Sequence, residues 1–190
     1  MITGRLVVLR GLEREDLKLL HRWLNDEEVM AWARSQPDHI ATMESIEKDY
    51  EQDLKGENYT RCVYIIVEKK TGKPVGWARI RWSPPTDTTC DLGLVIAEKQ
   101  LRGKGLGTEV TALLVKQAFD QLNMHKIELT TRPDNEAMVK VAKNCGFKLE
   151  GRLRETVYFN GKYHDGLMFG LIRNEHNRMR AEAFPKQIAQ

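Results

Sequence analysis

The segment Arg102–Thr108 is the part of the chain whose residue types and spacing point most clearly to chemistry. It reads Arg-Gly-Lys-Gly-Leu-Gly-Thr, follows a predicted strand over 91–96 and opens a long amphipathic stretch. Glycine lets a backbone turn sharply and approach a ligand closely. Backbone N–H groups in such a loop, together with the positive end of a helix, bind phosphate oxygens. The segment therefore predicts a site for a phosphate-bearing ligand, with Arg102 and Lys104 adding positive charge.

The common phosphate loops do not fit this segment. A Walker loop needs Gly-Lys-Ser/Thr at the helix start, whereas here glycine follows Lys104. A dinucleotide fold places its first glycine directly after the strand, whereas residues 97–102 intervene here. Glu128, which would have to bind the ribose, falls in the middle of a predicted strand. A glycine-rich turn without a ligand is the remaining alternative from the glycines alone.

The elements around this loop predict a single domain of the α/β or α+β class. A length of 190 residues suits one domain. Hydrophobic periodicity separates strands from helices, and Asn160–Gly161 between two alternating runs indicates a hairpin. Strands are predicted over 5–10, 62–68, 74–82, 90–96 and 127–131, and helices over 13–24, 43–54, 106–122 and 135–144.

The composition excludes several classes of protein. Hydrophobic residues make up 41% and charged residues 30%, which is typical of globular proteins rather than disordered or collagenous ones. A formal net charge of +3 gives little reason to expect a nucleic-acid partner. The absence of a long apolar run indicates no membrane partner. The three cysteines (Cys62, Cys90 and Cys145) are far apart, so we expect inert thiols, no metal site and a cytoplasmic location.

The register Arg102-x-x-Gly105-x-Gly107 resembles the pyrophosphate-loop signature of the GNAT superfamily of acyl-CoA-dependent N-acetyltransferases. Two further segments downstream, Asn135–Ala137 and Gly146–Phe147, resemble the Asn-x-Ala and Gly-Phe markers of that family. The hairpin at 160–163 and the segments 6–10 and 20–26 are similar to its RimJ/RimL and spermidine-acetyltransferase-like branch. The resemblance covers roughly residues 3–175.

This resemblance implies a fold and a cofactor. The fold is a GNAT-like domain over residues 1–175, followed by a polar tail over 176–190. Its sheet is mixed, mostly antiparallel, flanked by helices and splayed between the strands at 91–96 and 127–131. The co-substrate is acetyl-CoA, with no metal. Its pantetheine arm contacts the backbone of Val95 and Ile96 and the side chain of Asn135. Its pyrophosphate contacts Arg102, Gly103, Lys104, Gly105, Leu106, Gly107 and Thr108.

The chain departs from the family at the groups that move protons. Many relatives carry a tyrosine, the proton donor to the leaving thiolate, where this chain has Ala142. Thr130 stands where some N-terminal peptide acetylases place a glutamate base. Asp91 is the one family-like acid on the central strand, so we assign it as the candidate catalytic base acting through water. The alternative for Asp91 is a strand-end carboxylate paired with a surface cation.

The function implied is transfer of an acetyl group from acetyl-CoA to a primary amine. Deprotonating a lysine-like amine of pKa about 10.4 at pH 7 costs about 4 kcal/mol, against about 1 kcal/mol for an α-amine. Without an evident strong base, we expect a small-molecule or peptide acceptor of lowered pKa: a peptide or protein N-terminus, an amino acid or an amino sugar. The alternatives are a polyamine acetyltransferase and a non-catalytic acyl-CoA-binding or sensing module. A homodimer is a further expectation.

Overall fold

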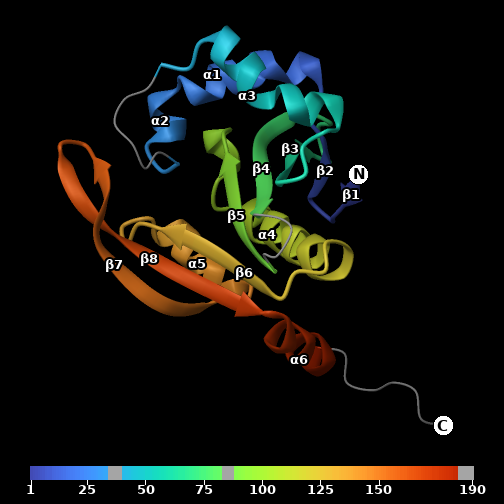
Figure 1. Cartoon of the computed structure of the whole chain (residues 1–190), viewed down its shortest axis with the longest axis vertical. Helices are drawn as coiled ribbons and strands as arrows, with labels where there is room; N and C mark the ends of the chain where they lie inside the picture. The colour runs from blue at the N-terminus through green and yellow to red at the C-terminus, as the bar shows by residue number, and fades with distance from the viewer. Residues whose placement is uncertain (34–39, 83–87, 184–190) are drawn as a thin grey trace.

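The computed structural model describes residues 1–33, 40–82 and 88–183 and contains an eight-stranded sheet with helices on both faces (Figure 1). The strand order is β1-β2-β3-β4-β5-β6-β8-β7. The strands are β1 (Ile2–Thr3), β2 (Val7–Gly11), β3 (Arg61–Glu68), β4 (Pro74–Trp82), β5 (Thr89–Ile96), β6 (Lys126–Thr131), β7 (Lys148–Phe159) and β8 (Lys162–Ile172). The α-helices are α1 (Leu17–Leu24), α2 (Glu27–Met30), α3 (Met43–Lys55), α4 (Leu106–Lys116), α5 (Glu136–Asn144) and α6 (Arg173–Ala183).

Both predicted hairpins are present. β3 and β4 pair antiparallel, and β7 and β8 pair antiparallel around the Asn160–Gly161 turn. Asn160 has φ of 50° and Gly161 φ of 75°, the two positive values that a type I′ turn requires. This turn lies on the same side of the molecule as α2 in Figure 1.

Alternation along β4 and β5 sends side chains to two cores on opposite faces of the sheet. Ala78 and Leu92 join the larger core, which packs against α4 and α5. Trp77 and Val95 pack against the smaller core of α1 to α3. We call the second surface the N-terminal face of the sheet. Arg79 and Arg81 lie on this N-terminal face together with Trp77, because alternate residues of a regular strand share a face and β4 pairs with β5 without a bulge.

The sheet opens between β5 and β6, as expected. These strands form the one parallel pair among the described strands, and their pairing runs only from Thr89↔Lys126 to Asp91↔Glu128. The remaining residues of β5, 92–96, keep their pairing with β4 alone. One edge of β5 is therefore free of strand partners over half its length, which is the splay that the resemblance implied.

Two segments differ from the pattern expected from sequence. The helix predicted over 106–122 consists of α4 followed by a π-helical turn at Gln117–Gln121. The expected tail from 176 onward begins inside α6, which packs on the domain: the His176 ring lies 5.1 Å from that of Phe119. Residues 184–190 lie outside the described residues. Apolar contact along α6 therefore continues beyond the expected boundary at 175.

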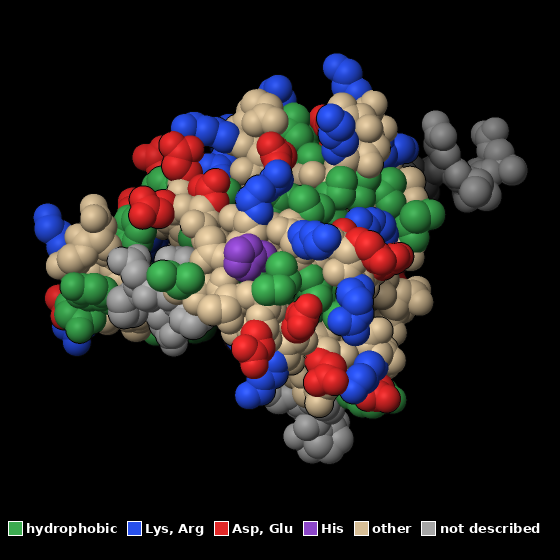
Figure 2. Space-filling view, turned by 90° about the horizontal axis from the view of Figure 1, so that it is seen from above, with side chains coloured by type: hydrophobic (Ala, Val, Ile, Leu, Met, Phe, Trp, Pro, Cys, Tyr) green, Lys and Arg blue, Asp and Glu red, His purple; other side chains and the backbone are tan. Residues whose placement is uncertain are grey.

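In the part of the chain that the structure describes, no helix is long and apolar enough to cross a membrane. Seen from above, the surface carries lysine and arginine side chains interspersed with aspartate and glutamate (Figure 2). The charge is mixed on this face, as expected from a formal net charge of +3.

Candidate functional site

The backbone of the glycine loop has the shape of an anion cradle at the start of α4. Gly103 has φ of +74° and Gly105 φ of +87°, values that other L-residues rarely adopt. Gly105 is the N-cap of α4, so the N–H groups of the following turn have no acceptor within the helix. Those N–H groups and the helix dipole favour a negatively charged ligand, so the loop fits a pyrophosphate.

Arg102 and Leu106 contribute to this loop in a structural way. Arg102 Nε donates to the carbonyl oxygen of Ile96 at 3.0 Å, and its backbone N–H donates to Lys99 at 3.1 Å. The side chain therefore ties the loop to the end of β5. The Leu106 side chain is buried in the larger core, so only its backbone faces the loop.

Glu109 was not predicted as part of this site, yet it holds α4 in place. Its carboxylate accepts the backbone N–H groups of Arg5 (2.7 Å), Leu6 (2.7 Å) and Val7 (2.9 Å). The carboxylate lies in the first turn of α4, where negative charge is favoured. The start of β2 is thereby fixed against the helix whose N-terminus forms the loop.

Val95 and Ile96, to which the resemblance assigned contacts with the pantetheine arm, lie near the end of β5. Both fall in the part of β5 that β6 does not cover, and they pair with Trp77 and Gly76 of β4. Trp77 stacks on Trp23 of α1 at 5.8 Å between ring centroids, which supports the strand from the N-terminal face. The free edge of β5 thus leads from the opening to the glycine loop.

Asn135 and Ala142 occupy the two ends of α5. Asn135 caps the helix, accepting the backbone N–H of Met138 at 3.1 Å. Ala142, the position of the family's tyrosine, is fully buried in the larger core. No phenol can act from this position.

Asp91 lies where the opening between β5 and β6 begins, and two arginine side chains contact its carboxylate. Its Oδ1 accepts from Arg81 Nε at 2.8 Å, and its Oδ2 lies 3.7 Å from Arg79 Nη2. Asp91 therefore combines both interpretations drawn from the sequence: it lies beside the opening and it is ion-paired. Its catalytic role stays a prediction.

Glu128 is the residue beside Asp91 that sequence reasoning missed. The two residues are partners in the parallel pairing of β5 with β6, so their side chains share the N-terminal face. Both line a hollow of about 420 Å³ with Arg81, Trp82 and Thr60. The one sequence signal for Glu128 was a charged residue in the middle of a short predicted strand. That Glu128 lies beside Asp91 depends on the pairing of β5 with β6, which the sequence does not indicate.

Arg132 forms a second unpredicted feature, a bridge across the N-terminal face. Its guanidinium lies 5.1 Å from the centroid of the Trp32 ring and 4.0 Å from that of the Phe159 ring, so it makes two cation–π contacts. It donates to the carbonyl of Ala31 at 3.0 Å and to Asp134 at 2.9 Å. The bridge joins the end of α2 to the hairpin of β7 and β8.

Of the three cysteines, Cys90 is buried, and Cys62 and Cys145 are half-buried. Burial raises the pKa of the Cys145 thiol to about 11 and raises that of Cys62 as well. The described residues contain no cluster of histidine, cysteine and carboxylate side chains that would bind a metal ion. The site therefore consists of a backbone anion cradle, an open strand edge and charged side chains.

Comparison with known proteins gives a consistent picture. The family model described as acetyltransferase (GNAT) domain matches residues 6–148. A spermidine N(1)-acetyltransferase of Escherichia coli (strain K12) is 25% identical over 176 residues, 93% of this chain and 91% of that protein. A putative ribosomal N-acetyltransferase of Bacillus subtilis (strain 168) is 32% identical over 85 residues, 45% of this chain and 46% of that protein.

Among solved structures, a spermidine N-acetyltransferase from Vibrio cholerae, in complex with CoA and spermine, superposes with a TM-score of 0.81. The match covers 92% of this chain and 99% of that one, at 22% identity. This likeness shows that the two chains share a fold.

Proposed function

The chain belongs to the acetyltransferase (GNAT) domain family and is an N-acetyltransferase that uses acetyl-CoA as its co-substrate; from this premise we propose where the co-substrate lies and which amines accept the acetyl group. The pyrophosphate of acetyl-CoA lies on the backbone of 102–108, and the pantetheine arm of acetyl-CoA lies along the free edge of β5 at Val95 and Ile96. The acceptor is a primary amine of lowered pKa: a peptide or protein N-terminus, an amino acid or an amino sugar.

One observation carries the placement of the co-substrate. The pairing of β5 with β6 ends at Asp91↔Glu128, and the free edge of β5 ends close to the loop, because Arg102 donates to Ile96. The strand edge that β6 leaves open and the phosphate cradle thus adjoin each other, with the Ile96 carbonyl already bound by Arg102. An extended amide-containing chain that ends in a pyrophosphate matches this edge and cradle in both shape and hydrogen bonding.

The thioester is already activated, so the protein has to bind, orient and manage protons. The acceptor ammonium first gives one proton to solvent, through water held by Asp91 or Glu128. The amine nitrogen then bonds to the acetyl carbon and the carbon–sulfur bond breaks. The second amine proton ends on the CoA sulfur, so the products are an amide, free CoA and one released proton.

The preference for low-pKa amines follows from Ala142 and Thr130. Neither side chain can take up or release a proton near neutral pH, and Asp91 is ion-paired. The deprotonation penalty then remains in the barrier, at about 4 kcal/mol for a lysine-like amine and about 1 kcal/mol for an α-amine. A difference of about 3 kcal/mol corresponds to roughly two orders of magnitude in rate.

Spermidine is the second candidate acceptor, because relatives that match nine-tenths of the chain bear the name spermidine N(1)-acetyltransferase. The two candidates are separated by free-thiol release from acetyl-CoA at pH 7 with four acceptors side by side. These are a short peptide with a free N-terminus, an amino sugar, spermidine and acetyl-capped lysine. We expect the peptide or the amino sugar to react fastest, and spermidine in first place would overturn the preference for low-pKa amines.

A further inference from the structure

Two arginines on the N-terminal face of β4 share one carboxylate. Arg79 and Arg81 lie opposite Gly93 and Asp91 of β5, and Asp91 contacts both guanidinium groups. Arg81 uses Nε for this contact, and its two terminal nitrogens have donors that no described residue accepts. We call Arg79 and Arg81 the arginine pair. The pair and Asp91 together carry one net positive charge.

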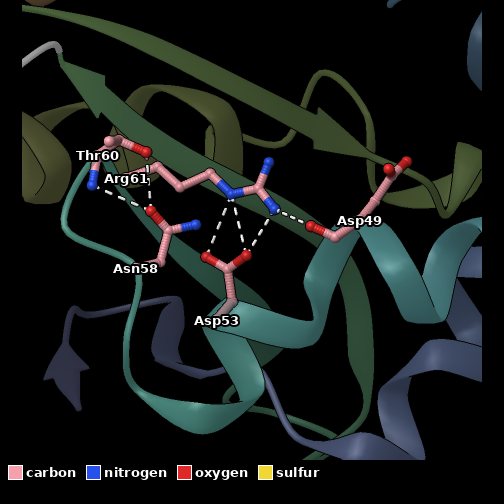
Figure 3. A network of polar contacts seen from close by, with 5 residues as sticks. All are labelled: Asp49, Asp53, Asn58, Thr60 and Arg61. Atoms are coloured by element: carbon pink, nitrogen blue, oxygen red, sulfur yellow. Dashed lines mark hydrogen bonds and ion pairs between the residues drawn. The ribbon is translucent and has the colours of Figure 1, made fainter.

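The strand on the other side of β4 places a third arginine beside the arginine pair and no negative group that would neutralise its charge. Arg61 is the register partner of Arg81, and like charges directly opposite each other destabilise a sheet. Its own partner is Asp53 of α3, which Arg61 Nε contacts at 3.0 Å, with a further bond to the backbone of Asp49 (Figure 3). Asp53 is thereby committed to Arg61. The arginine pair remains an electrostatic cost to the fold that a bound anion would offset.

The other side of the opening has the opposite charge. Lys126 Nζ lies 3.0 Å from Glu128 and 2.7 Å from Glu150, so one ammonium is shared by two carboxylates. The Glu150 carboxylate lies over Gly170, which is the partner of Glu128 in the pairing of β6 with β8. We call Glu128 and Glu150 the glutamate pair. With Lys126 this group carries one net negative charge.

One member of each charged group, Arg81 and Glu128, lines the same hollow. The cavity of about 420 Å³ has Arg81, Asp91 and Glu128 in its lining. The side chain of Arg81 is 56% exposed and that of Glu128 is 35% exposed, so both charged ends reach solvent. The other lining residues are Thr60, Trp82, Thr89 and Cys90, so the cavity extends from the last paired residues of β5 and β6 toward the start of β5. Under the proposed function, its edge at Asp91 and Glu128 borders the open part of β5, where the acetyl group would arrive.

We propose that the acceptor is zwitterionic, an amino acid or short peptide whose carboxylate is bound by the arginine pair while its ammonium lies toward the glutamate pair. This inference rests on the proposed function and narrows its acceptor class. Arginine suits the role because its planar fork forms two parallel hydrogen bonds with a carboxylate. A polycation such as spermidine lacks a group for the arginine pair and meets its positive charge instead.

The test compares acceptors with and without the carboxylate, each at the same concentration of unprotonated amine, because an amide in place of the carboxylate also lowers the pKa of the α-amine. Alanyl-alanine is compared with its C-terminal amide, and free alanine with alaninamide, which separates an amino acid from a peptide. We expect kcat/KM for the preferred acid to exceed that for its amide by about tenfold to a hundredfold, since the interaction is a charge-assisted hydrogen bond. Equal values for acid and amide in both matched pairs would overturn the inference.

Variants assign the effect to the arginine pair. Arg81→Gln, and separately Arg79→Gln, should bring the ratio of acid to amide close to one, mainly by raising KM for the acid. Arg178→Gln, on the exposed side of α6, is the matched control and should leave the ratio unchanged. An unchanged ratio in both Arg81→Gln and Arg79→Gln would overturn the assignment. If acetyl-CoA released no free thiol with any of these amines, the proposed function itself would fail. If it did so without a preference for the carboxylate, only this inference would fail.

Discussion

Asp91 of β5 and Glu128 of β6 are the last paired residues of the two central strands, and beyond them the strands part. Two carboxylates therefore stand side by side on the N-terminal face at the beginning of the opening. Asp91 is bound by Arg81 at 2.8 Å, and Glu128 by Lys126 at 3.0 Å. Under the proposed function, this pair lies beside the strand edge along which the pantetheine arm would run.

The first prediction concerns proton removal by these two carboxylates. A general base contributes about 10²–10⁴-fold to a rate. We expect Asp91→Asn to lower kcat near the lower end of this range, because the arginines occupy part of the carboxylate. Glu128→Gln provides the parallel measurement, and the larger loss identifies the main proton acceptor. If Asp91→Asn kept the parent kcat and pH profile, Asp91 would have no part in the mechanism.

The second prediction concerns the three N–H groups that Glu109 accepts. Glu109→Ala leaves the backbone donors of residues 5–7 without their acceptor, which should lower the free energy of unfolding by about 2–3 kcal/mol. Urea denaturation measures this loss. Glu136→Ala, in the first turn of α5 and exposed, is the control and should change stability by less than about 0.5 kcal/mol. Equal stability of Glu109→Ala and the parent would contradict the role of Glu109.

The third prediction concerns His176, where burial against Phe119 lowers the pKa of the imidazole below its ordinary value of 6.5. A depressed folded-state pKa means that the unfolded state binds the proton first as pH falls. Stability should therefore be full above about pH 6.5 and decline as the pH falls below that value. His176→Phe should flatten this decline, as followed by urea denaturation across that range.

The control for His176 is His21→Phe on α1, which lies away from this contact and should keep the parent slope. An identical pH dependence in the parent and in His176→Phe would show that the ring does not titrate against burial. The same measurement reports whether α6 is part of the folding unit, because His176 is one of its residues.

The sequence allowed good prediction of features that depend on local chemistry. The Asn160–Gly161 turn and the glycines of the loop each need a particular residue type at a particular place. The opening between β5 and β6 came from the family resemblance, since strand pairing at a distance leaves no local pattern.

The charged features of the site could not be predicted because they depend on register. Arg79 and Arg81 meet Asp91 only because β4 and β5 pair in one register, and Glu128 meets Asp91 only through a parallel pair. The same holds for Glu109, which contacts residues more than one hundred positions away. Arg132 is buried and contacts two aromatic rings from separate parts of the chain, and nothing near it in the sequence indicates either ring.

The most direct measurement is calorimetric titration of acetyl-CoA into the parent protein, Gly105→Asp and Gly72→Asp. Aspartate is among the residues that tolerate positive φ, so both variants should fold. Gly72 has φ of +68° in the turn between β3 and β4, and Gly105 has φ of +87° at the start of α4. The backbone change is therefore matched. We predict that Gly105→Asp lowers the affinity at least about tenfold, because a carboxylate would face the pyrophosphate, while Gly72→Asp binds like the parent. A folded Gly105→Asp variant with the parent's affinity would contradict the placement of the co-substrate on this loop.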